Sequence, residues 1–81
     1  MRLLCVEDEV ALREDIAEFL RMKSYDVDEA SNGQEAIDQL SRNRYDLVLC
    51  DIKMPNMDGY DLLQEVRRDN HLTATPFVFL T

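Results

Sequence analysis

The sequence predicts an α/β fold built on a parallel sheet, and three observations support this prediction. Short apolar runs of strand length alternate with amphipathic segments of helix length along all 81 residues. The runs at 2–6 and 45–50 show no polar alternation, as expected for strands that are covered on both faces. Both runs are followed directly by acidic residues. The order strand, helix, strand, helix, strand, helix, strand therefore favours right-handed crossovers within a single domain.

The first strand is the apolar run 2–6, and an amphipathic helix follows it. Between Glu9 and Lys23 apolar residues recur at helical spacing, while charged residues occupy the opposite side. We expect the apolar stripe of this helix to pack against the core, and only secondarily to form a surface for a partner. The stripe consists of Leu12, Ile16, Phe19 and Leu20.

The second strand and the second helix lie between residues 25 and 40. Residues 25–30 alternate between polar and apolar side chains, as a half-exposed edge strand does. Ser31 and Gln34 have the spacing of a capping box, which predicts that a helix begins there. Ala36, Ile37 and Leu40 supply its buried stripe.

The second half of the chain continues the same alternation. The run 45–50 is predicted to be a central strand, and the Pro, Asn, Asp and Gly residues of 53–59 predict a loop. A third helix, marked by Leu62, Leu63 and Val66, is predicted to run to about Arg68. The strand at 76–80 follows a polar connection, and its proline stands at the start, where a missing N–H is tolerated.

Composition excludes several classes of function. Nine basic and seventeen acidic residues give a net charge of −8, and no basic run marks a nucleic-acid or anionic-lipid surface. The apolar run at the N-terminus is too short for a signal peptide or a membrane span. We therefore expect a cytoplasmic chain that neither enters a membrane nor binds nucleic acid directly. Cys5 and Cys50 lie within apolar runs and are predicted to be buried, reduced thiols.

Polar residues stand where three of the predicted strands end. The carboxyl ends of parallel strands meet at one edge of a sheet, which would gather Glu7, Asp8, Asp51 and Thr81. Clustered carboxylates repel one another unless a cation lies among them, and Mg²⁺ is the natural choice for such oxygen ligands. Asp51 is then the preferred nucleophile for a phosphoryl group, with the hydroxyl of Thr81 as a hydrogen-bond donor to it.

Each of these residues also has a purely structural interpretation. Acids at strand ends often cap the following helix or face water, which applies to Glu7 and Asp8. Thr81 taken alone is a common strand residue. Asp51 is harder to explain in this way, because it directly follows an apolar run and precedes Ile52, Lys53, Met54 and Pro55.

Taken together, these residues resemble the receiver domain of two-component response regulators. "LLCVEDE" (3–9) is similar to the first strand of that family with its two acids, and "LVLCDIKMPNMDG" (47–59) to its phosphoacceptor strand and loop. "PFVFLT" (76–81) is similar to its fourth strand, which ends in Ser or Thr. The resemblance covers residues 1–81 and implies a flavodoxin-like sheet with strand order 2-1-3-4-5.

The resemblance also implies the roles of individual residues. Asp51 would accept a phosphoryl group from a phosphohistidine on a sensor histidine kinase or phosphotransfer protein. Glu7, Asp8, Asp51 and the main-chain carbonyl of Lys53 would hold Mg²⁺, and Thr81 would sense the phosphate. The chain would then be a phosphoacceptor in a phosphorelay that assists its own phosphorylation and dephosphorylation, and not a conventional enzyme.

Family receivers continue after the fourth strand with a helix, a fifth strand that carries a lysine, and a fifth helix. We therefore expect a receiver that is truncated at its C-terminus and lacks these elements. The fourth strand, 76–80, would leave an apolar edge that pairs with a second copy of the chain.

Two other functions compete with phosphotransfer. A degenerate receiver would serve only as a dimerisation or docking module, which the absence of the family lysine favours. A haloacid-dehalogenase-type phosphohydrolase also uses an Asp at the end of a parallel strand, but it needs a second Asp two residues later. That position holds Lys53, which argues against the hydrolase.

Overall fold

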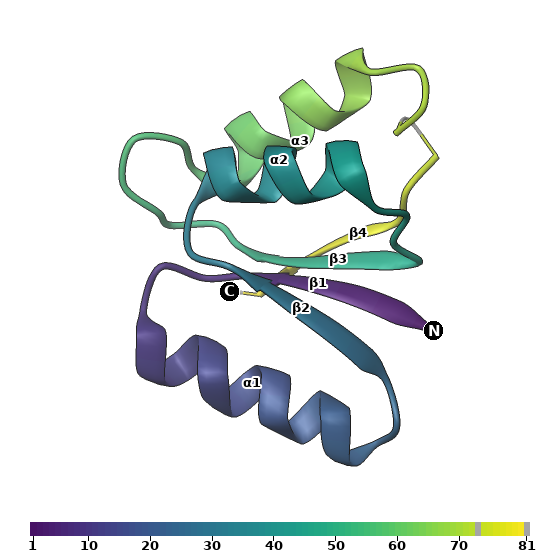
Figure 1. The fold of residues 1–81 in the computed structure, drawn as a ribbon. Coiled ribbons are helices and arrows are strands. Elements are labelled where there is room, and N and C mark those ends of the chain that lie inside the picture. Colours follow the sequence, from purple (N-terminus) through teal and green to yellow (C-terminus); the bar gives the residue numbers. More distant parts are fainter. Residues whose placement is uncertain (73, 81) are drawn as a thin grey trace.

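The computed structural model describes residues 1–72 and 74–80. Strands and helices alternate along the chain as the sequence predicts (Figure 1). The strands are β1 (Arg2–Val6), β2 (Asp26–Ala30), β3 (Leu47–Asp51) and β4 (Phe77–Leu80), and the helices are α1 (Val10–Met22), α2 (Gly33–Arg42) and α3 (Gly59–Arg68).

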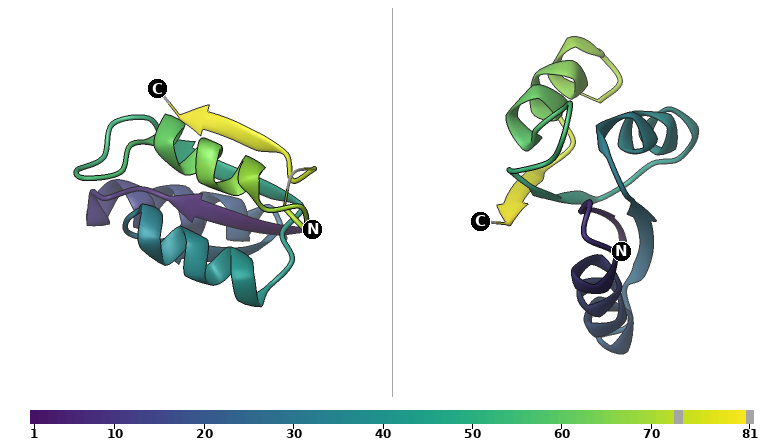
Figure 2. Two further views of the ribbon diagram at one scale, coloured as in Figure 1. Left: turned by 90° about the horizontal axis from the view of Figure 1, so that it is seen from above. Right: turned by 90° about the vertical axis from the view of Figure 1, so that its left-hand side faces the viewer.

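The four strands form one parallel sheet in the order β2-β1-β3-β4. Helix α1 covers one face, and α2 and α3 cover the other, so the molecule has three layers (Figures 1 and 2). This arrangement confirms the predicted flavodoxin-like fold, including the strand order for the strands that are described. None of the helices in residues 1–72 and 74–80 has the length and apolar character that a membrane span requires.

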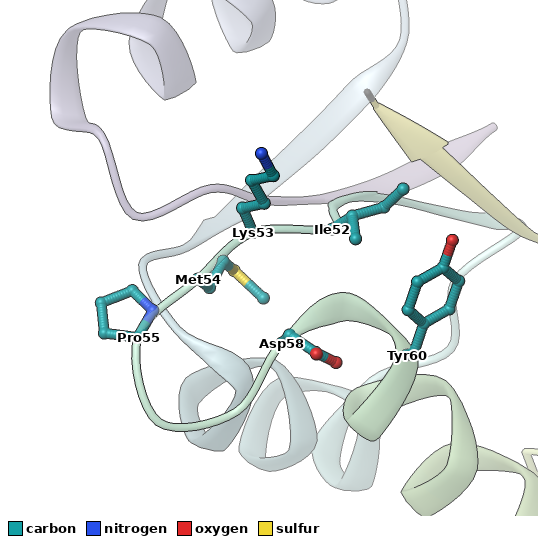
Figure 3. A pocket seen from close by; sticks show the side chains of 6 residues that line it. All are labelled: Ile52, Lys53, Met54, Pro55, Asp58 and Tyr60. Carbon is teal, nitrogen blue, oxygen red and sulfur yellow. The ribbon is translucent and has the colours of Figure 1, made fainter.

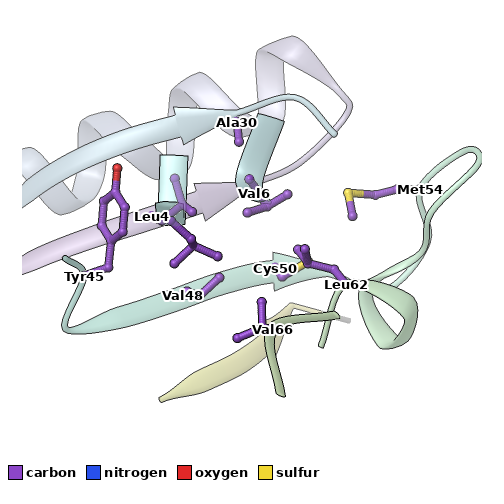
Figure 4. Packing of buried hydrophobic residues seen from close by; sticks show 11 residues of the cluster. Leu4, Val6, Ala30, Tyr45, Val48, Cys50, Met54, Leu62 and Val66 are labelled. Carbon is purple, nitrogen blue, oxygen red and sulfur yellow. The ribbon is translucent and has the colours of Figure 1, made fainter. Parts of the chain in front are cut away.

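The sheet separates two clusters of buried side chains. Successive residues of a strand point to opposite faces, so Leu4 and Val6 join the cluster under α2 and α3, whereas Leu3 and Cys5 join the one under α1. This explains why the β1 sequence is apolar without alternation. The larger cluster, shown in Figure 4, contains Leu4, Val6, Ala30, Ala36, Leu40, Tyr45, Val48, Cys50, Met54, Leu62 and Val66.

Both cysteines are buried and free, as the sequence predicts. Cys5 belongs to the smaller cluster and Cys50 to the larger one. Burial raises the pKa of the Cys5 thiol to about 11 and that of the Cys50 thiol to about 12. Both side chains therefore behave as small apolar residues of the core.

The predicted apolar stripe of α1 is only half correct. Ile16 and Leu20 pack against the smaller cluster, but Leu12 is 43% exposed and Phe19 is 58% exposed. The buried residue of α1 is Ala17. A side chain this small lets the helix lie close to the sheet, and the larger residues on the neighbouring faces then remain at the surface.

The predicted cap of α2 is shifted by one residue. Asn32 is the N-cap, and its side chain accepts a hydrogen bond of 2.8 Å from the N–H of Glu35. Ser31 stands before the cap and donates its N–H and hydroxyl to the carboxylate of Glu35, both at 2.8 Å. Asn caps a helix as well as Ser does, and this register places an acid in the first turn, where the helix dipole favours it.

Candidate functional site

Three carboxylates converge at the carboxyl edge of the sheet. β1 and β3 are neighbours with Val6 opposite Cys50, so both strands end at the same level. Glu7 and Asp8 directly follow β1, and Asp51 is the last residue of β3. Each offers one carboxylate oxygen, and these oxygens lie within 4.8 Å of one another. The predicted gathering of these three acidic residues therefore occurs in the structure.

Glu7 is the buried member of this acidic cluster, with 2% of its surface exposed. Its Oε2 accepts a hydrogen bond of 3.0 Å from the N–H of Glu9. Burial raises the pKa of Glu7 to about 7, and the neighbouring Asp8 and Asp51 act in the same direction, against the opposing effect of the Glu9 bond. Glu7 is thus poised between its protonated and charged forms near neutral pH.

The other two carboxylates are accessible from solvent. Asp8 is exposed and Asp51 is partly buried. The Oδ1 atom of Asp51 accepts a hydrogen bond of 3.4 Å from the N–H of Lys53, which is longer than the usual range of about 2.7–3.2 Å. The Asp51 carboxylate is therefore only loosely held by protein groups and remains open to a ligand that arrives from outside.

Helix α3 begins unusually close to the end of β3. The N–H of Gly59 donates to the carbonyl of Ile52 at 2.8 Å. A Cβ atom on Gly59 would lie 2.6 Å from the carbonyl oxygen of Asp51 and 3.0 Å from Cα of Ile52. Only a glycine fits this approach without a shift of the backbone beside Asp51.

A capping box fixes the same end of α3. The N–H of Asp61 donates to Oδ1 of Asp58 at 2.8 Å, and the N–H of Asp58 donates to Oδ2 of Asp61 at 3.2 Å. This box was not predicted from the sequence. Its signal is two acids three positions apart directly before the apolar stripe of a helix.

The acidic cluster fits a small, hard divalent cation. Its donors are carboxylate oxygens, which Mg²⁺ and Ca²⁺ prefer. In an octahedral Mg²⁺ shell, neighbouring oxygens lie about 3.0 Å apart and opposite oxygens about 4.2 Å apart, and the three carboxylate oxygens lie within 4.8 Å of one another. They would therefore have to move closer together to contact one ion directly, or contact it in part through water. A cation there would also relieve the repulsion among three acids.

Two predicted site residues keep roles that the structure does not test. The main chain of Lys53 lies beside Asp51 through its N–H, and the use of its carbonyl as a metal ligand stays a prediction. Thr81 lies outside the described residues, so its role as a phosphate sensor also stays a prediction.

An open hollow of about 490 Å³ adjoins the site. Figure 3 shows that its side chains come from the loop after β3 and from the start of α3. On its far side the ring of Tyr60 meets that of Phe79 edge-on, with 5.0 Å between centroids. The loop after Asp51 thus presents a largely apolar surface. The lining residues are Ile52, Lys53, Met54, Pro55, Asp58 and Tyr60.

Comparison with known sequences identifies related proteins along nearly the whole chain. The family model of the response regulator receiver domain matches residues 3–81. The chain is 44% identical over 80 residues to the response regulator Rre1 of Synechocystis sp., covering 98% of this chain and 35% of that protein. It is 42% identical over 81 residues to the transcriptional regulatory protein PdtaR of Mycobacterium tuberculosis, covering 99% of this chain and 38% of that protein. The chain spans little more than a third of these relatives.

Solved structures show the same likeness. The N-terminal domain of a response regulator receiver protein from Methanoculleus marisnigri matches with a TM-score of 0.96 and 30% identity, over 99% of this chain and 65% of that chain. The receiver domain of a signal transduction histidine kinase from Syntrophus aciditrophicus matches with a TM-score of 0.92 and 35% identity, over 99% of this chain and 61% of that chain. The described strands and helices are thus those of a receiver domain.

A methyl group at Gly59 should disturb the site more than one at Gly33. We expect Gly59→Ala to lower the free energy of unfolding by about 1–3 kcal/mol, because the new atom meets backbone beside Asp51. In Gly33→Ala the nearest atom is the flexible Sδ of Met57, so the cost should stay below about 1 kcal/mol. Urea denaturation of both variants checks this, and equal losses would contradict the account of α3.

The buried carboxyl of Glu7 should make the metal-free chain less stable as the pH rises. The folded chain binds more protons at Glu7 than the unfolded chain between its ordinary pKa of 4.5 and its raised pKa of about 7. Its contribution is therefore fully present below the ordinary pKa and is lost as the pH rises through the raised one.

Chemical denaturation between about pH 5 and pH 8, without divalent cations, measures this effect. The free energy of unfolding should fall more steeply in the parent chain than in Glu7→Gln, which has no group to titrate. Parallel curves would show that burial does not perturb Glu7.

Proposed function

The chain belongs to the response regulator receiver family, and on that premise we propose that it is a phosphoacceptor module of a two-component phosphorelay. Asp51 accepts a phosphoryl group from a phosphohistidine on a sensor histidine kinase or phosphotransfer protein. The observation that supports this most is the convergence of oxygens from Glu7, Asp8 and Asp51 at the ends of two neighbouring strands.

The transfer replaces one bond to phosphorus with another. An oxygen of Asp51 attacks the phosphorus, an acyl phosphate forms, and the bond to the donor imidazole breaks with its electron pair going to the ring nitrogen. Partial burial and the long hydrogen bond from the N–H of Lys53 leave this oxygen available for attack. The apolar loop beside it provides a surface for the donor protein.

Glu7, Asp8, Asp51 and the main-chain carbonyl of Lys53 would hold Mg²⁺. When bound, the ion would offset the negative charge of the acids and of the incoming phosphoryl oxygens. Thr81 would donate its hydroxyl to the phosphoryl group. The chain consumes its own acceptor in each transfer, and we therefore do not regard it as a conventional enzyme.

We place this reaction in the cytoplasm, where the buried thiols of Cys5 and Cys50 stay reduced. With a net charge of −8, the chain is proposed to make no direct contact with nucleic acid. The competing proposal is a docking module without phosphotransfer, and the same experiment distinguishes the two.

Incubation with Mg²⁺ and acetyl phosphate should add one phosphoryl group to the chain, as measured by intact mass. Asp51→Asn should abolish the addition, because an amide is no nucleophile here. Asp8→Asn should slow it while leaving the acceptor in place. Asp15→Asn, an exposed change on α1, should behave like the parent chain.

Two results would overturn the proposal. A parent chain that gains no mass would leave only the docking function. An Asp51→Asn variant that is phosphorylated as readily as the parent would move the acceptor to another residue.

We also propose that residues 1–81, taken by themselves, associate with a second copy through β4. Among the described residues β3 is the only strand that pairs with β4, and Val78 is 46% exposed. Exposed apolar edges of this kind pair readily. Sedimentation velocity should show a dimer that Val78→Lys weakens, and a parent chain that stays monomeric at high concentration would contradict the pairing.

A further inference from the structure

Arg13 joins three segments that are distant in sequence. It lies near the start of α1, and its side chain is only 14% exposed. Its Nη1 donates to the main-chain carbonyl of Glu7 at 3.0 Å, and its Nε donates to Oε1 of Glu29 at 3.3 Å. The guanidinium thus links the end of β1 to α1 and β2.

Together with two further hydrogen bonds, these contacts hold the main chain and the side chain of Glu7 in place. The N–H of Glu7 donates to the carbonyl of Ala30 at 3.1 Å, and its carboxylate accepts from the N–H of Glu9 at 3.0 Å. The carbonyl of Glu7 belongs to the peptide that leads into Asp8, and Arg13 is the side chain that holds it. A hydrogen bond from a charged donor is stronger than one from a neutral donor. The direction of the Glu7–Asp8 peptide therefore depends on Arg13.

We propose that Arg13, held in place by Glu29, is a positioning residue for the metal-binding acidic cluster. Repulsion among three carboxylates favours an open turn after β1, and Arg13 opposes this by fixing the peptide between Glu7 and Asp8. Pairing with Glu29 also keeps the guanidinium occupied, so that it does not take the place of a cation among the acids. This inference rests on the proposed function, because it assumes that the cluster binds Mg²⁺.

Arg21 provides a matched control. Its Nη1 donates to Oε2 of the same Glu29 at 3.2 Å, and its Nη2 donates to the main-chain carbonyl of Val27 at 2.6 Å. Loss of Arg21 therefore removes one ion pair and one bond to a carbonyl, as loss of Arg13 does. Those bonds support β2 and not the turn that carries the acidic cluster.

The test is titration of the 81-residue chain with MgCl₂, followed by amide chemical shifts in NMR spectra that also report folding. We expect Arg13→Met to weaken Mg²⁺ binding by about tenfold, the scale seen for groups that orient metal ligands. Arg21→Met should change it by less than about twofold, within experimental scatter for a remote site. Arg13→Lys keeps the charge but lacks the planar fork, so its affinity should fall between those of Arg13→Met and the parent.

Stability in metal-free buffer separates positioning from general support of the fold. Urea denaturation should show comparable losses for Arg13→Met and Arg21→Met, although only the first loses affinity for Mg²⁺. Should Arg13→Met fail to fold, Arg13→Lys and Glu29→Gln carry the test, and both should bind Mg²⁺ more weakly than Arg21→Met.

The outcomes distinguish this inference from the proposed function. A parent chain that binds Mg²⁺ and is phosphorylated, with Arg13 and Arg21 variants of equal affinity, would overturn only the role of Arg13. A parent chain that binds no Mg²⁺ would overturn the proposed metal site and the role of Arg13 with it.

Discussion

The parallel pairing of β1 with β3 is the constraint on which the site depends. Because Val6 lies opposite Cys50, the residues that follow β1 and the last residue of β3 reach the same edge of the sheet. A slip of either strand by one residue would turn its side chains to the opposite face of the sheet and so exchange the residues that fill the two clusters. The register that buries the core therefore also fixes the distance between Asp51 and the two acids after β1.

Bringing three carboxylates together is unfavourable by itself, and the surrounding structure opposes their separation. Glu7 is buried and its pKa is raised. The fold therefore disfavours the charged form of this carboxyl and still keeps the side chain buried. Short local bonds hold both loops: Arg13 and Glu9 after β1, and the capping box with Gly59 after β3. The site is thus organised before any ligand arrives, which lowers the cost of binding one.

The sequence predicted most of the fold and the acidic cluster, because both depend on local patterns. Apolar runs that end in acids mark strands whose ends meet, and this requires only that the sheet be parallel. The order of the strands came from the family resemblance, since periodicity carries no information on which strands are neighbours. Phe19 was misassigned to the core because helical spacing alone does not show which part of a broad apolar face meets the sheet. Arg13 was not recognised because its partners, Glu7 and Glu29, meet it only in the folded chain.

A crystal structure of the chain grown with magnesium tests the central claim most directly. The account predicts one cation bound by oxygens of Glu7, Asp8 and Asp51, either directly or through water, with direct contacts of about 2.1 Å. The Arg13 side chain should keep its bonds to the Glu7 carbonyl and to Glu29. A cation bound elsewhere, or three carboxylates that turn away from one another in the presence of magnesium, would contradict it.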